Sequence, residues 1–295
     1  MCECVTIILA FQRRTIPALP TCCSFVTTIV KPGKEDAMLR TITHKKKYTF
    51  ARTCIDLCRG LKRSLVTVAE VGQDNAVALV KLDDGKMNAF SFDMISRIDS
   101  AMEDCRDAGA IIISGNEKCL SAGFDLSVMG KGPSPEAGDM LRKGCELAIK
   151  IAEFPRPTIF AAGGHAMALG AIMLFTGDLR IGVSDNGKAK IGLNEVHIGM
   201  PLPIVGMELA RWRLSANHLT RATTLGNIYS PQEAILAGYL DECVPSAELE
   251  QYAIESAEAY SRIKTLPFVT TKKNERRDVL KACRDGLETD VKMFS

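Results

Sequence analysis

From residue 65 onward, the hydrophobic and polar positions predict strands and helices that alternate along the chain. Residues 66–71 and 76–82 are rich in β-branched and apolar side chains, and the turn-prone residues 72–75 lie between them. Three further apolar segments, at 110–114, 158–162 and 179–183, are short and continuous, as expected for strands covered on both faces.

Helix boundaries are marked by capping residues. Ser91 precedes a segment with apolar side chains at spacings of three and four, and Ser134 is followed by Pro135 at the first helical position. Ser230 and Glu233 form a capping-box pattern, and Gly238 ends that short helix. Two more helices are expected at about 247–264 and 269–285. This alternation predicts an α/β fold of stacked sheets with helices outside.

Composition and charge narrow the class of protein. The 295 residues are 46% hydrophobic and 24% charged, which excludes a wholly disordered or fibrous chain. No apolar run approaches the ~20 residues of a membrane span. The segment 1–64 holds 12 basic and 4 acidic residues, whereas the remainder is mildly acidic, which argues against a nucleic-acid partner.

The first segment, 1–64, is predicted to be an extension that is separate from the folded body. It is basic, rich in hydroxyl side chains and poor in acids, which fits either an organelle transit peptide or a disordered tail. The first reading implies mitochondria, the second the cytoplasm, and the C-terminal residues carry no peroxisomal signal. Six of the 11 cysteines lie in this segment, but their spacing does not fit a zinc site, so no metal is expected.

Two glycine-bearing stretches follow predicted strands and lead into helices. One covers residues 118–126 and the other residues 163–171. Small residues let a ligand approach the backbone, and the first N–H groups of a helix are free to bind negative charge. Two such donors aimed at one oxygen would form an oxyanion hole. An ordinary tight turn is the alternative, and for the first stretch alone it is favoured.

A third stretch, residues 191–203, contains one carboxylate in largely apolar surroundings. Burial raises the pKa of a carboxyl group, so Glu195 would suit proton abstraction near neutral pH. The alternative is a glutamate that points into solvent or caps a turn.

Together, these three stretches resemble the enoyl-CoA hydratase/isomerase (crotonase) superfamily over residues 65–285. The resemblance implies a spiral of ββα turns at 65–245 and a C-terminal helical region at 246–295 that supports trimers or hexamers. It also implies a fatty acyl-CoA thioester as substrate, with coenzyme A as part of that substrate and no separate cofactor. The backbone N–H groups of Phe124 and Leu169 match the oxyanion donors. The implied substrate-binding residues are Lys86, Asn88, Ala89, Ala122, Gly123, Asp125, Gly170 and Ile172.

The acidic residues distinguish among the activities found in this family. Hydratases use two glutamates, and the position of the first is Ile172 here, whereas the second matches Glu195. A single glutamate is similar to the Δ3,Δ2-enoyl-CoA isomerases of fatty acid β-oxidation. The alternatives are a hydratase, another acyl-CoA lyase or hydrolase, and a non-catalytic acyl-CoA-binding protein.

Several other residues have a structural explanation that is favoured over a functional one. His165 and His197 flank the expected site, but a histidine in such a loop is more often structural. Asp125 is expected to cap the short helix after the first stretch. The basic cluster of Lys272, Lys273, Arg276 and Arg277 is expected to be a solvated helix face.

Overall fold

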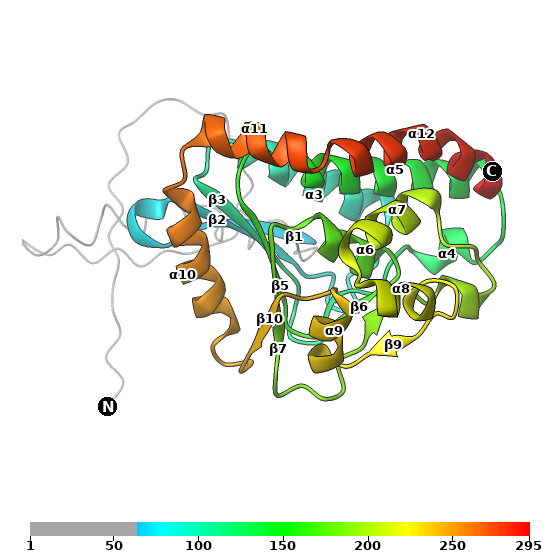
Figure 1. Ribbon diagram of the computed structural model, residues 1–295, viewed down its shortest axis with the longest axis horizontal. Coiled ribbons are helices and arrows are strands. Elements are labelled where there is room, and N and C mark those ends of the chain that lie inside the picture. The colour runs from blue at the N-terminus through cyan, green and yellow to red at the C-terminus, as the bar shows by residue number, and fades with distance from the viewer. Residues whose placement is uncertain (1–63) are drawn as a thin grey trace, which may run out of the picture. The chain divides into compact units, whose positions relative to one another are not determined.

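The computed structural model describes residues 64–295, which fold around two β-sheets with helices on their outer faces (Figure 1). The extension expected at 1–64 lies outside the described residues except for Ser64. The larger sheet has the order β1-β2-β3-β5-β7-β10, in which only β1 and β2 pair antiparallel. Its strands are β1 (Val66–Val71), β2 (Val77–Leu82), β3 (Ala110–Ser114), β5 (Thr158–Ala162), β7 (Leu179–Val183) and β10 (Glu242–Val244).

The smaller sheet has the order β4-β6-β8-β9. Its strands are β4 (Cys119–Ser121), β6 (His165–Met167), β8 (Ile191–Gly192) and β9 (Ile228–Tyr229). The first three are parallel neighbours. Successive strands alternate between the sheets, because β3, β5 and β7 belong to the larger one while β4, β6 and β8 each follow into the smaller one. A helix then closes each turn, which confirms the expected spiral of ββα turns.

The helices were predicted well where a cap marks them. Ser91, Ser134 and Ser230 each accept a backbone N–H at a helix start, and Ser230 completes its capping box with Glu233. The α-helices are α3 (Phe92–Asp104), α4 (Leu126–Met129), α5 (Pro135–Ala152), α6 (Leu169–Thr176), α7 (Ile204–Arg213), α8 (Ala216–Ala222), α9 (Pro231–Ala237), α10 (Leu249–Ser261), α11 (Thr265–Glu275) and α12 (Arg277–Phe294). Two short 3-10 helices are η1 (Gln73–Asn75) and η2 (Glu195–Ile198).

The larger sheet is covered on both faces, as its apolar strands predicted. On one face Val77, Leu79 and Ile112 pack with Ala253 and Ala257 of α10. The alternate residues of the same strands enter the main core with the other helices. This period-two division is the reason why these strands read as continuous apolar runs.

The basic cluster near the C-terminus is not wholly a solvated face, so that prediction was wrong for two of its members. Lys272 and Arg276 are buried, and their cationic groups lie 2.7 and 2.5 Å from the two carboxylate oxygens of Asp178. Arg276 also donates to the backbone oxygens of Ala152 and Thr176. Its backbone separates α11 from α12, so the single helix expected at 269–285 is two helices.

Asp290 joins α12 to the N-terminus of α7, the helix that follows Glu195. Its carboxylate accepts the backbone N–H groups of Ile204 at 2.7 Å and Val205 at 3.0 Å, and its side chain is fully buried. We expect Asp290→Ala to lower the free energy of unfolding by about 1–3 kcal/mol, because it leaves two buried donors without an acceptor. Urea unfolding tests this. Asp285→Ala, an exposed position on the same helix, is the control and is expected to change stability by less than about 0.5 kcal/mol.

Candidate active site

Each of the three stretches singled out in the sequence contains one of three adjacent strands of the smaller sheet. Parallel strands end at the same edge, and β4, β6 and β8 are parallel. The chain after Ser121, Met167 and Gly192 therefore emerges side by side at that edge. The Ala168 N–H donates to the Gly192 oxygen at 3.0 Å, which fastens the second stretch to the third.

The first stretch is a tight turn built around Gly123. Its φ of 97° is in the region that favours glycine, and its N–H donates to the Ser121 hydroxyl. The Gly123 oxygen accepts from Phe90, and Asp125 donates its own N–H to the Phe90 oxygen. The Phe124 N–H between them has no acceptor among the described residues. The Asp125 carboxylate caps α4 by accepting the Ser127 N–H at 2.9 Å, as expected.

The second stretch brings another free N–H next to this turn. Ala168 precedes α6 with φ 50° and ψ −124°, an unusual conformation for a residue with a side chain. Leu169 begins α6, and its N–H also has no acceptor among residues 64–295. A Cβ placed on Gly123 would lie 3.3 Å from the Leu169 nitrogen and 2.8 Å from the Ala168 Cβ. The two stretches are therefore in close contact, and Gly123 is what permits it.

Glu195 lies at the start of η2, only 6% exposed. Burial raises the pKa of its carboxyl group to about 7, while its own backbone N–H opposes that rise. One oxygen, Oε2, is buried without a hydrogen-bond partner in the described residues. The solvent-exposed alternative is thus wrong, and the carboxyl group is poised to gain or lose a proton near neutral pH.

The raised pKa predicts a cost to stability. Folded Glu195 holds its proton more tightly than the unfolded chain, so stability falls as pH rises from about 4.5 to about 7. Glu195→Gln cannot ionise at this position. Above about pH 8, its free energy of unfolding should therefore exceed that of the wild type by about 3 kcal/mol. The difference should vanish below about pH 4. Urea unfolding at the two pH values tests this, with exposed Glu117→Gln as the control that should show no such gap.

Ile172, expected at the position of the first hydratase glutamate, is buried between helices. It lies on α6, and a Cβ on Gly206 of α7 would be 2.8 Å from its Cδ1 atom. The same Cβ would be 3.1 Å from Leu202. The surroundings of Ile172 on α7 are therefore apolar.

The segment around Lys86 lies against the first stretch. The Ala122 N–H donates to the Met87 oxygen, and the Ser121 hydroxyl donates to the Asn88 oxygen. The Asn88 side chain is fully buried, with its amide nitrogen 3.0–3.2 Å from three backbone oxygens and its Oδ1 accepting the Asp84 N–H. This side chain positions the segment, whereas Lys86 is exposed and Ala89 is half-buried.

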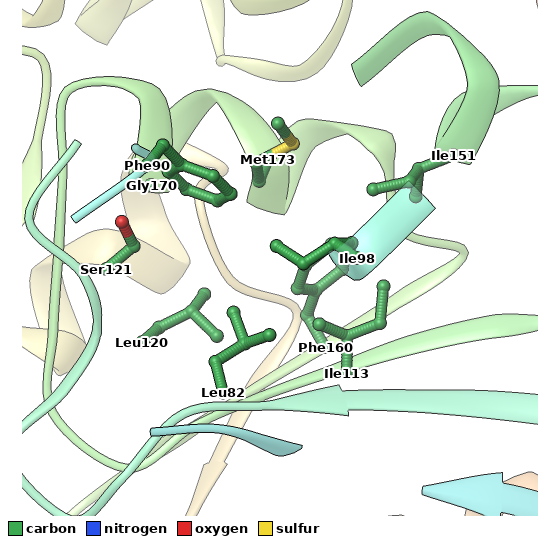
Figure 2. A pocket seen from close by; sticks show the side chains of 10 residues that line it. All are labelled: Leu82, Phe90, Ile98, Ile113, Leu120, Ser121, Ile151, Phe160, Gly170 and Met173. Carbon is green, nitrogen blue, oxygen red and sulfur yellow. The ribbon is translucent and has the colours of Figure 1, made fainter. Parts of the chain in front are cut away.

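Gly170 and Ser121 also line a small cavity (Figure 2). Its volume is about 10 Å³, and apart from Ser121 its lining is apolar, with Met173, Phe90 and Leu120 nearby. A space of this size holds one water at most. It is a packing defect of the core and too small for an acyl chain.

The two histidines have structural partners. The His165 Nδ1 accepts the Lys190 N–H at 3.0 Å, and burial and the charge of Lys190 lower its pKa. The His197 Nε2 lies 3.0 Å from the Leu225 oxygen. The structural explanation is therefore sufficient for both.

The chain matches a known protein family. The family model described as enoyl-CoA hydratase/isomerase matches residues 72–295. The chain belongs to the enoyl-CoA hydratase/isomerase family. It is 26% identical to human mitochondrial enoyl-CoA delta isomerase 1 over 223 residues, covering 74% of this chain and 73% of that protein. It is 28% identical to a probable mitochondrial enoyl-CoA hydratase of Dictyostelium discoideum over 255 residues, covering 84% and 85%.

A solved apo structure, described as an Mtb enoyl-CoA isomerase, superposes with a TM-score of 0.73 at 32% identity. It covers 78% of this chain and 99% of that one. Isomerases and hydratases are thus similarly close to this enoyl-CoA hydratase/isomerase family member. The family supports an enzyme of fatty acid metabolism with an acyl-CoA substrate.

Two features of residues 64–295 bear on membranes and metal ions. No helix there is both long and apolar enough to cross a bilayer. No group of three or more histidine, cysteine or acidic side chains in that range is placed to bind a metal ion.

Sequence reasoning missed two buried tyrosines, Tyr229 and Tyr239. Tyr229 is paired with Ile191 of β8, and both hydroxyls lack partners in the described part of the chain. The sequence signal for these residues is only that a tyrosine occurs in each of two otherwise ordinary segments, and that signal is weak.

Proposed function

We propose that this family member is an enoyl-CoA isomerase that moves a 3-enoyl-CoA double bond to the 2-enoyl position. The observation that carries the proposal is one buried carboxyl with a pKa of about 7, at the sheet edge where two free N–H groups also lie, with an isoleucine in place of a second acid. Isomerases and hydratases share this fold, and the side chains of this chain favour an isomerase.

In the proposed reaction, the Glu195 carboxylate removes a proton from C2. The electron pair moves into the thioester, whose oxygen becomes the oxyanion of a dienolate. The Phe124 and Leu169 N–H groups donate to that oxygen, and each donor is typically worth about 3–4 kcal/mol in the transition state. Glu195 then returns the proton to C4 as the double bond forms between C2 and C3. One carboxyl group is sufficient because it acts first as base and then as acid.

Hydration would have different requirements. It adds a water across the C2–C3 double bond, and that water has to be held and activated by a second polar group. Ile172 cannot do this, and its contacts on α7 are apolar. We therefore propose that hydratase activity is absent, that coenzyme A enters only as part of the substrate and that no cofactor is needed. A homotrimer or hexamer, and mitochondria as the compartment, remain proposals.

The proposed base predicts a pH dependence. Only the carboxylate form can abstract the C2 proton, so kcat should rise with pH and reach half of its maximum near pH 7. Initial rates of conjugated thioester formation from a 3-enoyl-CoA, measured across this range, test the prediction. A flat profile through pH 7 would mean that another group is the base.

The competing functions are separated by product. The full-length protein is incubated with a 3-enoyl-CoA and, separately, with a 2-enoyl-CoA. The proposal expects conjugated thioester from the first and no 3-hydroxyacyl-CoA from the second. Rapid hydration of the second would favour a hydratase, and binding without turnover would favour an acyl-CoA-binding protein.

A further inference from the structure

Several buried polar atoms of the described residues lack hydrogen-bond partners, and one of them is the Oε2 atom of Glu195. Among the described residues, six buried side-chain polar atoms lack a hydrogen-bond partner. One belongs to Ser114, and the other five belong to Asn194, Glu195, His218, Tyr229 and Tyr239. Buried polar groups are nearly always hydrogen-bonded to protein or ordered water, so such a concentration calls for a function.

Three of these side chains form a continuous row of rings that reaches α6, the helix that begins at Leu169. The Phe175 ring, on α6, stacks on Tyr239 with a centroid separation of 5.1 Å. Tyr239 contacts Tyr229 at 5.6 Å, and Tyr229 contacts His218 at 5.6 Å. Tyr239 is fully buried and Tyr229 is 6% exposed, whereas His218 is half-buried. The row thus runs from the buried side of the site toward the surface.

The tyrosine row lies beside the segment that leads to Glu195, because Tyr229 of β9 is paired with Ile191 of β8. The pKa of the neighbouring Tyr239 is raised first by burial, then by Tyr229 and by Glu195. The Leu193 N–H, two residues before Glu195, has the opposite influence on the same hydroxyl, although it does not reach full hydrogen-bond geometry. The Tyr239 hydroxyl therefore lies near Leu193, between β8 and Glu195, and it stays protonated as a donor at neutral pH.

We propose that Tyr239, supported by Tyr229, is a positioning residue that is hydrogen-bonded to the Glu195 carboxylate through one buried water. In this arrangement the water accepts the Tyr239 O–H and supplies the donor that the Glu195 Oε2 lacks, and the Tyr229 O–H in turn donates toward Tyr239. The row stabilises the base in its reactive form and fixes the direction of its carboxylate. The role assigned to Tyr239 rests on the proposed function of Glu195 as the base.

Few charges face this row. Arg221 of α8 lowers the pKa of Tyr229, and Glu233 of α9 raises it, with burial as the larger influence. Glu233 is exposed and is already held by the Ser230 backbone and hydroxyl. For Glu195 itself, burial is the dominant influence and its own N–H the lesser one. A hydroxyl donor is thus the group in this row that is able to stabilise the Glu195 carboxylate.

The test is the pKa of Glu195 itself, because it requires no turnover. Full-length protein labelled with ¹³C at glutamate carboxyl carbons is titrated by NMR, and the Glu195 signal is assigned by its loss in Glu195→Gln. Removing a donor to a carboxylate raises the pKa of that carboxylate. We expect Tyr239→Phe to raise the pKa of Glu195 by about one unit, a tenfold change in the acid constant. Tyr229→Phe should raise it by less, and Tyr260→Phe, an exposed tyrosine on α10, should leave it unchanged.

The outcomes are separable from those of the proposed function. An unchanged Glu195 pKa in a folded Tyr239→Phe protein overturns the positioning role. If that variant does not fold, Tyr229→Phe decides, and an unchanged pKa there also overturns the role. Tyr239→Phe could raise the pKa of Glu195 while the unmodified protein does not isomerise a 3-enoyl-CoA. That result would support the hydrogen bond and reject the isomerase proposal.

Discussion

Glu195→Gln is expected to lower the isomerisation rate by about 100- to 10,000-fold, the range that a single general base contributes. Glutamine has the same shape but cannot accept the C2 proton. Ile172 occupies the position of the other hydratase glutamate, so no carboxylate there can replace Glu195. The measurement is kcat for conjugated thioester formation from a 3-enoyl-CoA. Substrate binding, measured by calorimetry, should change little.

Two controls keep this result specific. Glu117→Gln changes an exposed glutamate at the opposite end of β4 and should retain the wild-type rate. Far-ultraviolet circular dichroism establishes that each variant is folded. A Glu195→Gln protein that keeps more than about a tenth of the wild-type rate would remove Glu195 as the base, because a general base contributes at least about 100-fold.

Gly123→Ala is expected to lower kcat by about 100- to 1,000-fold, the loss associated with one oxyanion donor. The new Cβ would lie 2.8 Å from the Ala168 Cβ and 3.2 Å from the Met167 oxygen. Relief of this clash would push the two turns apart and move the Phe124 and Leu169 N–H groups off a common oxygen. The measurement is again kcat with a 3-enoyl-CoA.

The matched control is Gly132→Ala. Gly132 has a similar positive φ of 89°, but a Cβ there would meet nothing within 4 Å. It shares the backbone strain without the clash, so its kcat should be unchanged. Ala168→Gly removes the nearest colliding atom, and adding it to Gly123→Ala should restore part of the rate. If Gly132→Ala lost as much activity as Gly123→Ala, general backbone strain would explain the effect, and the oxyanion turn would not.

The parts of the fold that were predictable from sequence carry local signals. Ser91, Ser134 and Ser230 mark helix starts because a hydroxyl at that position satisfies backbone N–H groups within three residues. The apolar strands of the larger sheet were also recognisable, since both of their faces are covered. Local patterns indicated the two small-residue stretches and the lone carboxylate Glu195, and the resemblance then assigned the individual donors Phe124 and Leu169 and the role of Glu195.

The parts that were not predictable depend on contacts between distant segments. The short strands β4 and β6 lie within stretches that were expected to be loops, because three residues are too few to show a period. The burial of Lys272 and Arg276 depends on Asp178, which is about one hundred residues away in sequence. Likewise, the tyrosine row depends on contacts among α6, β9 and the turn after α9.

The central claim is that one carboxyl group, with no second acid, moves a double bond without adding water. The most direct test is the mass and absorbance of the product formed when the full-length protein acts on a 3-enoyl-CoA. The account predicts that conjugated thioester absorbance appears while the product keeps the mass of the substrate. A product heavier by one water, formed as fast as the substrate disappears, would contradict it.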